Sequence, residues 1–232
     1  MAVEATGRHW RKNTLIKDKL MSGADSMGVA VTSAQAELLS GYIQLLSKWN
    51  RKYNLTAVRC PEQMVSRHIL DSLAIFPWVK ETFGAGARVL DVGSGPGLPG
   101  IPLAIMMPEL QVTTLDCVDK KNRFQRQAGI ELGLNNVTVV HARVEKWQPQ
   151  ERYNLIVSRA FSSLASMVTH TRHLLGSSGL WLAMKGRYPD EEIQELRASC
   201  PFVSLLGCHS LTVAACEGER HQVILAPTCT AD

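Results

Sequence analysis

The sequence predicts an α/β protein in which a mainly parallel sheet carries helices on both faces. Three observations lead to this fold class. After Gly84 and Gly86, short strand-like apolar segments alternate with longer helix-like segments. The first of these strands runs directly into a turn rich in glycine and proline, Gly93–Pro102, from which a helix starts. Two strand-like segments near the C-terminus have no helix between them, which predicts an antiparallel hairpin at a sheet edge.

The segments before this alternation are predicted to form an N-terminal helical extension. Thr32 and Gln35 have the spacing of a capping box, and the helix that they open presents apolar residues at helical period on one face. A second helix is predicted to start at Pro61, which suits a first helical position, and to stop near Pro77. Residues 1–30 are polar and weakly patterned, and we interpret them as a mobile arm or a short helix.

The rest of the chain divides into regular elements. Strands are predicted at 88–92, 111–116, 137–141, 153–158 and 179–184, and helices at about 99–107, 119–133, 163–175 and 189–198. The C-terminal hairpin is expected from segments near 202–213 and 219–226. Three regions follow from this pattern, namely a basic N-terminal arm (1–30), a helical extension (31–84) and the α/β domain (85–228).

Composition indicates an ordinary globular protein, with 45% hydrophobic and 20% charged residues in a chain of 232. No apolar run approaches the roughly 18 residues of a membrane span. The first residues lack the apolar centre of a secretory signal, so a cytoplasmic location and no membrane contact are expected. The six cysteines are scattered without a C-x-x-C pair, which predicts reduced thiols and no metal site. No heptad pattern suggests a coiled-coil interface, so a monomer is expected.

The net charge of +4 is concentrated near the N-terminus. Residues 1–60 hold nine Lys and Arg against four Asp and Glu, a net of +5, whereas residues 61–232 hold sixteen against seventeen, a net of −1. This basic cluster predicts contacts with nucleic-acid phosphates, the alternative being a solvated helix face and tail. Its members are Arg8, Arg11, Lys12, Lys17, Lys19, Lys48, Arg51, Lys52 and Arg59.

The turn Gly93–Pro102 is the strongest functional signal in the chain. Its Gly95-x-Gly97-x-x-Gly100 spacing matches a dinucleotide-binding pattern. However, the three prolines of the turn lack the N–H groups that a pyrophosphate needs. Asp91, at the end of the strand, is also a poor neighbour for a pyrophosphate and a good one for a cation. The turn therefore favours S-adenosylmethionine, which carries a sulfonium and an ammonium and no phosphate; a nicotinamide dinucleotide and a turn without ligand remain alternatives.

Further candidate ligands of this cofactor follow the next two strands, since ligands bind outside the carboxyl ends of parallel strands. Asp116 lies 16 residues past Gly100, close to the spacing at which an acidic residue binds ribose hydroxyls. Asp119 is a weaker candidate because it suits a helix N-cap. The segment containing Val144 and Glu145 can lie along the adenine edge, although Glu145 equally suits a solvated surface.

Cationic side chains follow the fourth and fifth predicted strands. Arg159 and Lys185 emerge at the ligand face and are interpreted as binders of the cofactor carboxylate or of RNA phosphate. Phe161 suits either stacking on a base or capping of the core. His68 lies beside an apolar stripe and is interpreted as a hydrogen-bonded packing residue rather than a catalyst.

Taken together, six motifs resemble the bacterial small-subunit ribosomal RNA guanine-N7 methyltransferases, from about Thr32 to Ala226. The motifs are Lys48–Thr56, Arg67–Ser72, Gly93–Pro102, Ser158–Phe161, Lys185–Gly186 and Glu219–His221. The resemblance implies a Rossmann-like class I fold that depends on S-adenosylmethionine. It implies cofactor contacts at Gly93, Leu98, Val144, Glu145 and Arg159, and methyl transfer to N7 of one guanine in 16S ribosomal RNA of the small subunit.

Guanine N7 carries an unprotonated lone pair, so its methylation needs no general base. No catalytic acid or base is therefore assigned, and the rate is expected to come from holding N7 in line with the methyl group. Two other readings remain. One is a methyltransferase of another acceptor, and the other is a non-catalytic RNA-binding assembly factor.

Overall fold

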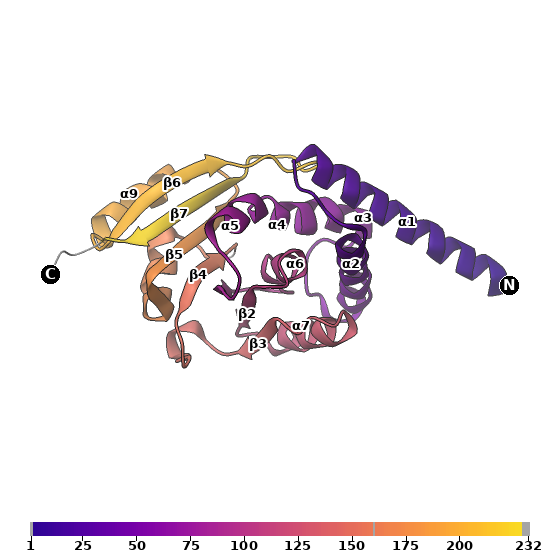
Figure 1. Cartoon of the computed structure of the whole chain (residues 1–232), viewed down its shortest axis with the longest axis horizontal. Coiled ribbons are helices and arrows are strands. Elements are labelled where there is room, and N and C mark those ends of the chain that lie inside the picture. Colours follow the sequence, from indigo (N-terminus) through magenta and orange to yellow (C-terminus); the bar gives the residue numbers. More distant parts are fainter. Residues whose placement is uncertain (1, 160, 229–232) are drawn as a thin grey trace.

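The computed structural model describes residues 2–159 and 161–228, with side chains from Thr14 onward. Within these residues, a seven-stranded sheet has the order β3-β2-β1-β4-β5-β7-β6 (Figure 1). The strands are β1 (Arg88–Val92), β2 (Gln111–Asp116), β3 (Val137–His141), β4 (Tyr153–Ser158), β5 (Leu175–Lys185), β6 (Val203–Ser210) and β7 (His221–Pro227). Strands β1 to β5 are parallel, and β7 runs antiparallel to both β5 and β6. The predicted fold class and the antiparallel hairpin are confirmed.

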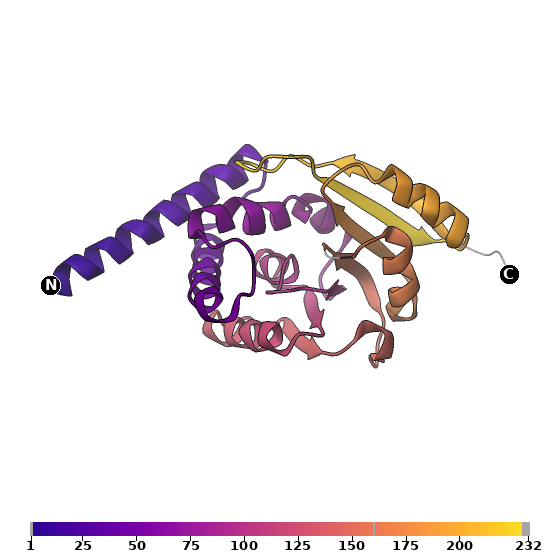
Figure 2. The same ribbon diagram turned by 180° about the vertical axis from the view of Figure 1, so that it is seen from behind.

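Helices cover both faces of the sheet, as predicted (Figures 1 and 2). They are α1 (Ala2–Ser26), α2 (Ser33–Tyr53), α3 (Pro61–Met64), the π-helical η1 (Val65–Leu70), α4 (Asp71–Leu73), α5 (Phe76–Thr82), α6 (Gly100–Met106), α7 (Asp119–Glu131), the 3-10 turns η2 (Val144–Lys146) and η3 (Arg172–Leu174), α8 (Leu164–Thr171) and α9 (Asp190–Ser199). One buried hydrophobic cluster joins one face to α6, α7 and the N-terminal helices, and a second joins the other face to α8 and α9.

The N-terminal segment forms one helix of 25 residues instead of a mobile arm or a short helix. Ile16, Leu20 and Ala24 recur at every fourth position and are buried against the neighbouring helices. Most residues of this segment are polar, so the three apolar positions are too few to predict a buried helix from the sequence. Since the same cluster holds residues of α1 and of the sheet, the division into regions 1–30, 31–84 and 85–228 stays a prediction.

The capping box at the start of α2 is confirmed. The Thr32 hydroxyl accepts a hydrogen bond from the Gln35 amide (3.2 Å), and the Gln35 side chain accepts one from the Thr32 amide (2.9 Å). The second predicted helix starts at Pro61 as expected, but it contains a π-helical stretch and ends at Leu73. Pro77 lies in the first turn of α5 instead of marking a stop. Proline lacks only an N–H that a first turn leaves unpaired, so it suits either position.

Two boundaries near β5 also differ from expectation. The helix predicted over 163–175 ends at Thr171 and is followed by η3. Strand β5 begins at Leu175, earlier than the predicted 179. In the described part of the chain, no helix is both long and apolar enough to cross a membrane.

Candidate functional site

The turn between β1 and α6 depends on glycine in left-handed backbone conformations. Gly93, Gly95 and Gly97 have φ values of 68°, 60° and 99°. L-amino acids with a Cβ atom rarely adopt such values, which explains the glycines. The Gly95 amide donates a 2.9 Å hydrogen bond to Asp116 Oδ2, so the turn is tied to the end of β2.

Gly100 explains how α6 approaches β1 so closely. Its amide donates a 2.8 Å hydrogen bond to Asp91 Oδ2. A Cβ atom at position 100 would lie 2.9 Å from that oxygen and 2.9 Å from Thr114 Cγ2. The turn therefore packs directly on the buried carboxylate at the end of β1.

Asp91 is the most unusual ionisable group of the site. It is fully buried, and among the described residues its Oδ1 has no hydrogen-bond partner. Burial raises the pKa of Asp91 to about 7, although the Gly100 amide and the nearby positive charge of Arg159 act in the opposite direction. A buried carboxylate oxygen without a partner favours a cation, as the sequence suggested.

Asp116, the predicted ribose ligand, is also buried at the end of β2. Its Oδ2 accepts from Gly95 and, at 3.2 Å, from Lys121 Nζ, and its Oδ1 accepts from the Val118 amide at 2.9 Å. In this structure the Asp116 carboxylate holds the turn through the Gly95 amide, and its role in ribose binding stays a prediction. Asp119, the weaker candidate, starts α7 and pairs with Arg123 at 2.7 Å.

The other predicted cofactor residues lie at the same edge of the sheet. Gly93 and Leu98 belong to the turn, and the Leu98 side chain is buried in the core. Val144 and Glu145 follow β3 in η2; Val144 is buried, whereas Glu145 is exposed, 3.8 Å from His170 Nδ1. Arg159 follows β4. The strand ends thus bring all six predicted residues to one edge, and their contacts with a ligand stay predictions.

Two buried side chains that sequence reasoning did not assign to the site support the turn from α2 and α7. The Tyr42 hydroxyl donates a 2.9 Å hydrogen bond to the Pro96 carbonyl. The Gln125 amide donates to Ser94 Oγ (3.0 Å) and to the Gly95 carbonyl (2.7 Å). For Tyr42, the available signal was a polar atom on an otherwise apolar helix stripe, which a periodicity count treats as core; Gln125 lies in a mostly polar helix that carries no such signal.

We expect Tyr42→Phe to lower the free energy of unfolding by about 1–3 kcal/mol, because it leaves the buried Pro96 carbonyl without its donor. Urea denaturation measures this change. Tyr188→Phe is the matched control, since Tyr188 is 54% exposed and its hydroxyl should contribute little. Equal stability of the two variants would contradict the bracing role of Tyr42.

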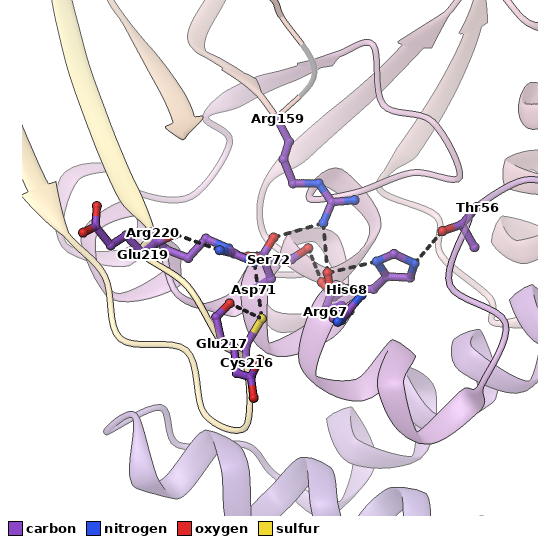
Figure 3. Close-up of polar contacts among 10 residues, drawn as sticks. All are labelled: Thr56, Arg67, His68, Asp71, Ser72, Arg159, Cys216, Glu217, Glu219 and Arg220. Carbon is purple, nitrogen blue, oxygen red and sulfur yellow. Dashed lines mark hydrogen bonds and ion pairs between the residues drawn. The ribbon is translucent and has the colours of Figure 1, made fainter. Parts of the chain in front are cut away.

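A cavity of about 480 Å³ opens at the carboxyl ends of β4 and β5, the same edge of the sheet as the turn, although no residue of the turn lines it. Its lining comes from η1, α4, the ends of β4 and β5, the segment before β7 and Val58. Figure 3 draws the lining residues of η1, α4, the end of β4 and the segment before β7. The lining residues are Val58, Arg67, His68, Asp71, Arg159, Met184, Lys185, Gly186, Leu211, Cys216, Glu217, Arg220 and His221.

Asp71 joins two arginines in this cavity (Figure 3). Its Oδ2 accepts from Arg159 Nη1 at 3.0 Å, and its Oδ1 accepts from Arg220 Nε at 2.8 Å. The contact with Asp71 raises the pKa of Arg220. Arg159 Nη1 also lies 3.4 Å from the Arg67 carbonyl oxygen. Sequence reasoning assigned no role to Asp71 or Arg220; the available signal was an acidic residue within an apolar helix stripe.

His68 is a buried, hydrogen-bonded residue, as predicted. Burial, with the nearby charge of Arg159, lowers its pKa to about 4, so it is neutral at pH 7. Its Nδ1 lies 2.9 Å from the Arg67 carbonyl and therefore donates, which makes Nε2 the acceptor of the Thr56 hydroxyl at 2.9 Å. Both ring nitrogens are thus engaged.

Lys185 and Phe161 occupy the adjacent wall. Lys185 pairs with Glu192 at 2.7 Å and donates to the Phe161 carbonyl at 3.2 Å. The Phe161 ring packs against the cluster on the α8 and α9 face, which is the core role considered above.

Among the described members of the predicted basic cluster, two are engaged within the protein, and contact of the cluster with nucleic acid stays a prediction. Lys17 pairs with Glu37 at 3.0 Å, and Lys19 donates to the Glu62 carbonyl at 3.0 Å. Exposed members are Lys48, Arg51, Lys52 and Arg59, whereas the side chains of Arg8, Arg11 and Lys12 lie outside the described residues.

The sheet order, the glycine turn after β1 and the buried acid beneath it give the chain a Rossmann-like fold of the class that many methyltransferases share. A solved structure of the glycopeptide N-methyltransferase MtfA, complexed with S-adenosyl-L-methionine, shares this fold with a TM-score of 0.57 and 13% identity, over 68% of this chain and 86% of that one.

The family described as rRNA small subunit methyltransferase G matches residues 35–224. The "Ribosomal RNA small subunit methyltransferase G" of Stutzerimonas stutzeri is 50% identical over 211 residues, which cover 91% of this chain and 95% of that relative. The protein of the same name from Pseudomonas aeruginosa (strain UCBPP-PA14) is 50% identical over 214 residues, covering 92% and 96%. The chain therefore belongs to the rRNA small subunit methyltransferase G family.

Proposed function

We propose that this protein transfers a methyl group from S-adenosylmethionine to N7 of a single guanine in 16S ribosomal RNA of the small subunit. Membership of the rRNA small subunit methyltransferase G family carries the proposal. The guanine numbered 527 is the acceptor that the family resemblance implies.

The turn fits S-adenosylmethionine better than a dinucleotide. The unpartnered Oδ1 of Asp91 favours a cationic ligand, and the prolines of the turn remove donors that a pyrophosphate would need. Gly93, Leu98, Asp116, Val144, Glu145 and Arg159 are the residues proposed to hold the cofactor. Arg159 suits its carboxylate, since Nε and Nη2 of this guanidinium have no partner among the described residues.

S-adenosylmethionine supplies an electrophilic methyl group on a sulfonium. Guanine N7 attacks through its lone pair, so no proton has to be removed. The engaged nitrogens of His68 agree with this requirement, because neither is available as a base. The protein's contribution is to hold the acceptor in line and to exclude water. Positive charge ends on the purine, where a carboxylate or carbonyl oxygen stabilises it.

The RNA partner is expected to contact the exposed arginines and lysines around the cavity and along α2. Arg67, at the cavity rim, has an exposed side chain, as do Lys48 and Arg51 of α2. An enzyme of ribosomal RNA would work in the cytoplasm, where small subunits are assembled. A monomer is the proposed oligomeric state.

Transfer of labelled methyl from S-adenosylmethionine tests the function. The acceptors are small ribosomal subunits and naked 16S RNA that both lack their own guanine-N7 mark, and the modified nucleotide is then mapped. Label on N7 of one guanine is the expected result. Absence of label with cofactor binding intact would favour another acceptor or a non-catalytic role in subunit assembly.

A further inference from the structure

The cavity at the ends of β4 and β5 has the size and the walls of a site for one nucleoside. Its 480 Å³ lies within the roughly 300–1,000 Å³ of ligand sites. Val58, Met184 and Leu211 contribute apolar walls, and arginines contribute planar cationic ones. Enzymes that modify a base usually extrude it from its stack into such a pocket. The cavity opens at the carboxyl end of β4, the strand that neighbours β1 and its proposed cofactor turn, and ligands of this fold lie at that edge of the sheet.

The donors around this cavity favour an anion. Arg67, Arg159, Lys185 and Arg220 line it, and His68 adds no charge because it is neutral at pH 7. Lys185 is already paired with Glu192 outside the lining, which leaves the three arginines as the available cations.

Each of the two central arginines keeps part of its guanidinium unengaged. Among the described residues, Arg159 makes its contacts, with Asp71 and the Arg67 carbonyl, through Nη1 alone. Arg220 uses one N–H each on Nε, Nη1 and Nη2, for Asp71, the Glu219 carbonyl (2.7 Å) and Cys216 Sγ (3.3 Å). A guanidinium has five N–H donors, so two of Arg220 stay available for an oxyanion.

Asp71 fixes these two arginines relative to each other. It is 4% exposed and gives one carboxylate oxygen to each guanidinium, at 3.0 and 2.8 Å. The arginines lie 88 and 149 residues further along the chain, one after β4 and one before β7. Figure 3 shows the carboxylate between them. A single buried anion thus sets the distance between groups at the ends of two strands that flank β5.

We propose that Asp71 is a positioning residue of the acceptor site. It orients Arg159 toward the cofactor and Arg220 toward a phosphate of the RNA strand, so that the extruded guanosine enters the cavity with N7 at the methyl group. This inference rests on the proposed function and adds to it the residues that hold the acceptor strand.

The test compares Asp71→Asn, Arg220→Gln and the control Arg197→Ala with the wild type. Arg197 is an exposed arginine of α9 that does not line the cavity. Its variant therefore loses the same positive charge as Arg220→Gln, but away from the proposed site. Measured quantities are kcat, KM for unmarked small subunits, Kd for S-adenosylmethionine, and the slope of subunit affinity against salt concentration.

For Arg220→Gln we expect KM for subunits to rise about tenfold and the salt slope to fall by about one, with the Kd for S-adenosylmethionine unchanged. Asp71→Asn keeps both arginines, so the salt slope should stay at its wild-type value. Its kcat should fall about tenfold or more, because the two groups lose their fixed separation. Arg197→Ala should match the wild type in all four quantities.

Two results would overturn the inference. One is an Arg220→Gln variant whose KM and salt slope equal those of Arg197→Ala. The other is an Asp71→Asn variant that melts at a lower temperature but keeps kcat and KM, which would make Asp71 a purely structural brace. If Asp71→Asn does not fold, Arg220→Gln decides. If wild-type protein methylates no subunit, the proposed function fails, and direct binding of 16S RNA still compares Arg220→Gln with the wild type.

Discussion

Gly100→Ala is expected to destabilise the protein by about 1–3 kcal/mol and to abolish cofactor binding. The added methyl group would lie 2.9 Å from both Asp91 Oδ2 and Thr114 Cγ2. Both belong to neighbouring central strands, so neither can move away freely. The start of α6 must shift instead, which breaks the hydrogen bond between the Gly100 amide and Asp91. Urea denaturation and calorimetric titration with S-adenosylmethionine measure the two effects.

Gly129→Ala is the matched control. Gly129 lies inside α7, and no atom lies within 4 Å of the position that its Cβ would occupy. Alanine there should stabilise the protein by up to about 1 kcal/mol through helix propensity and leave cofactor binding unchanged. The same chemical change thus acts in opposite directions at the two sites. A Gly100→Ala protein as stable as the wild type would refute the close packing of the turn on Asp91.

Asp91→Asn is expected to raise the free energy of unfolding near neutral pH and to weaken cofactor binding. The native pKa of Asp91, about 7, lies above its ordinary value of 3.8. Between these two pH values the folded chain holds a proton that the unfolded chain releases, so this group's contribution to stability falls as pH rises from about 4 to about 7. Asparagine has no carboxyl group to ionise, so the variant does not lose stability in this way as the pH rises. Near neutral pH it should therefore be more stable than the wild type, on the order of a few kcal/mol.

Cofactor binding should respond in the opposite way. If the ammonium of S-adenosylmethionine meets ionised Asp91, wild-type affinity should rise roughly tenfold per pH unit from about pH 5 to about pH 7. The asparagine variant should bind more weakly at neutral pH and show no such rise. Titrations of both proteins across this range make the comparison. Parallel pH profiles for the two proteins would show that Asp91 does not face a cation.

Local signals made much of the molecule predictable. The bounds of β1 to β4 follow from short apolar runs between turns, and the capping box sits at Thr32 and Gln35 as predicted. The cation preference of the turn could be argued from Asp91 and the prolines alone, because these residues are neighbours in the sequence.

Non-local contacts could not be predicted in the same way. Arg220 meets Asp71 only because β7 lies next to β5 and directs its start toward α4, a consequence of sheet order. The hydrogen bond between the Gly95 amide and the Asp116 carboxylate could not be predicted either, because the two residues are 21 positions apart in the sequence. The stripe of three apolar residues on α1 could be recognised only from the helices against which it is buried.

The position of β7 in the sheet has a consequence for how the protein is made. Within the described residues, β6 pairs with β7 alone, and β7 is the later of the two strands in the sequence. During synthesis, β7 is made after both strands between which it lies, so this part of the sheet closes only when β7 inserts between β5 and β6. Arg220 arrives with that same strand. A chain that stops before β7 would thus keep the turn between β1 and α6 but lose Arg220 and the wall of the cavity that precedes β7.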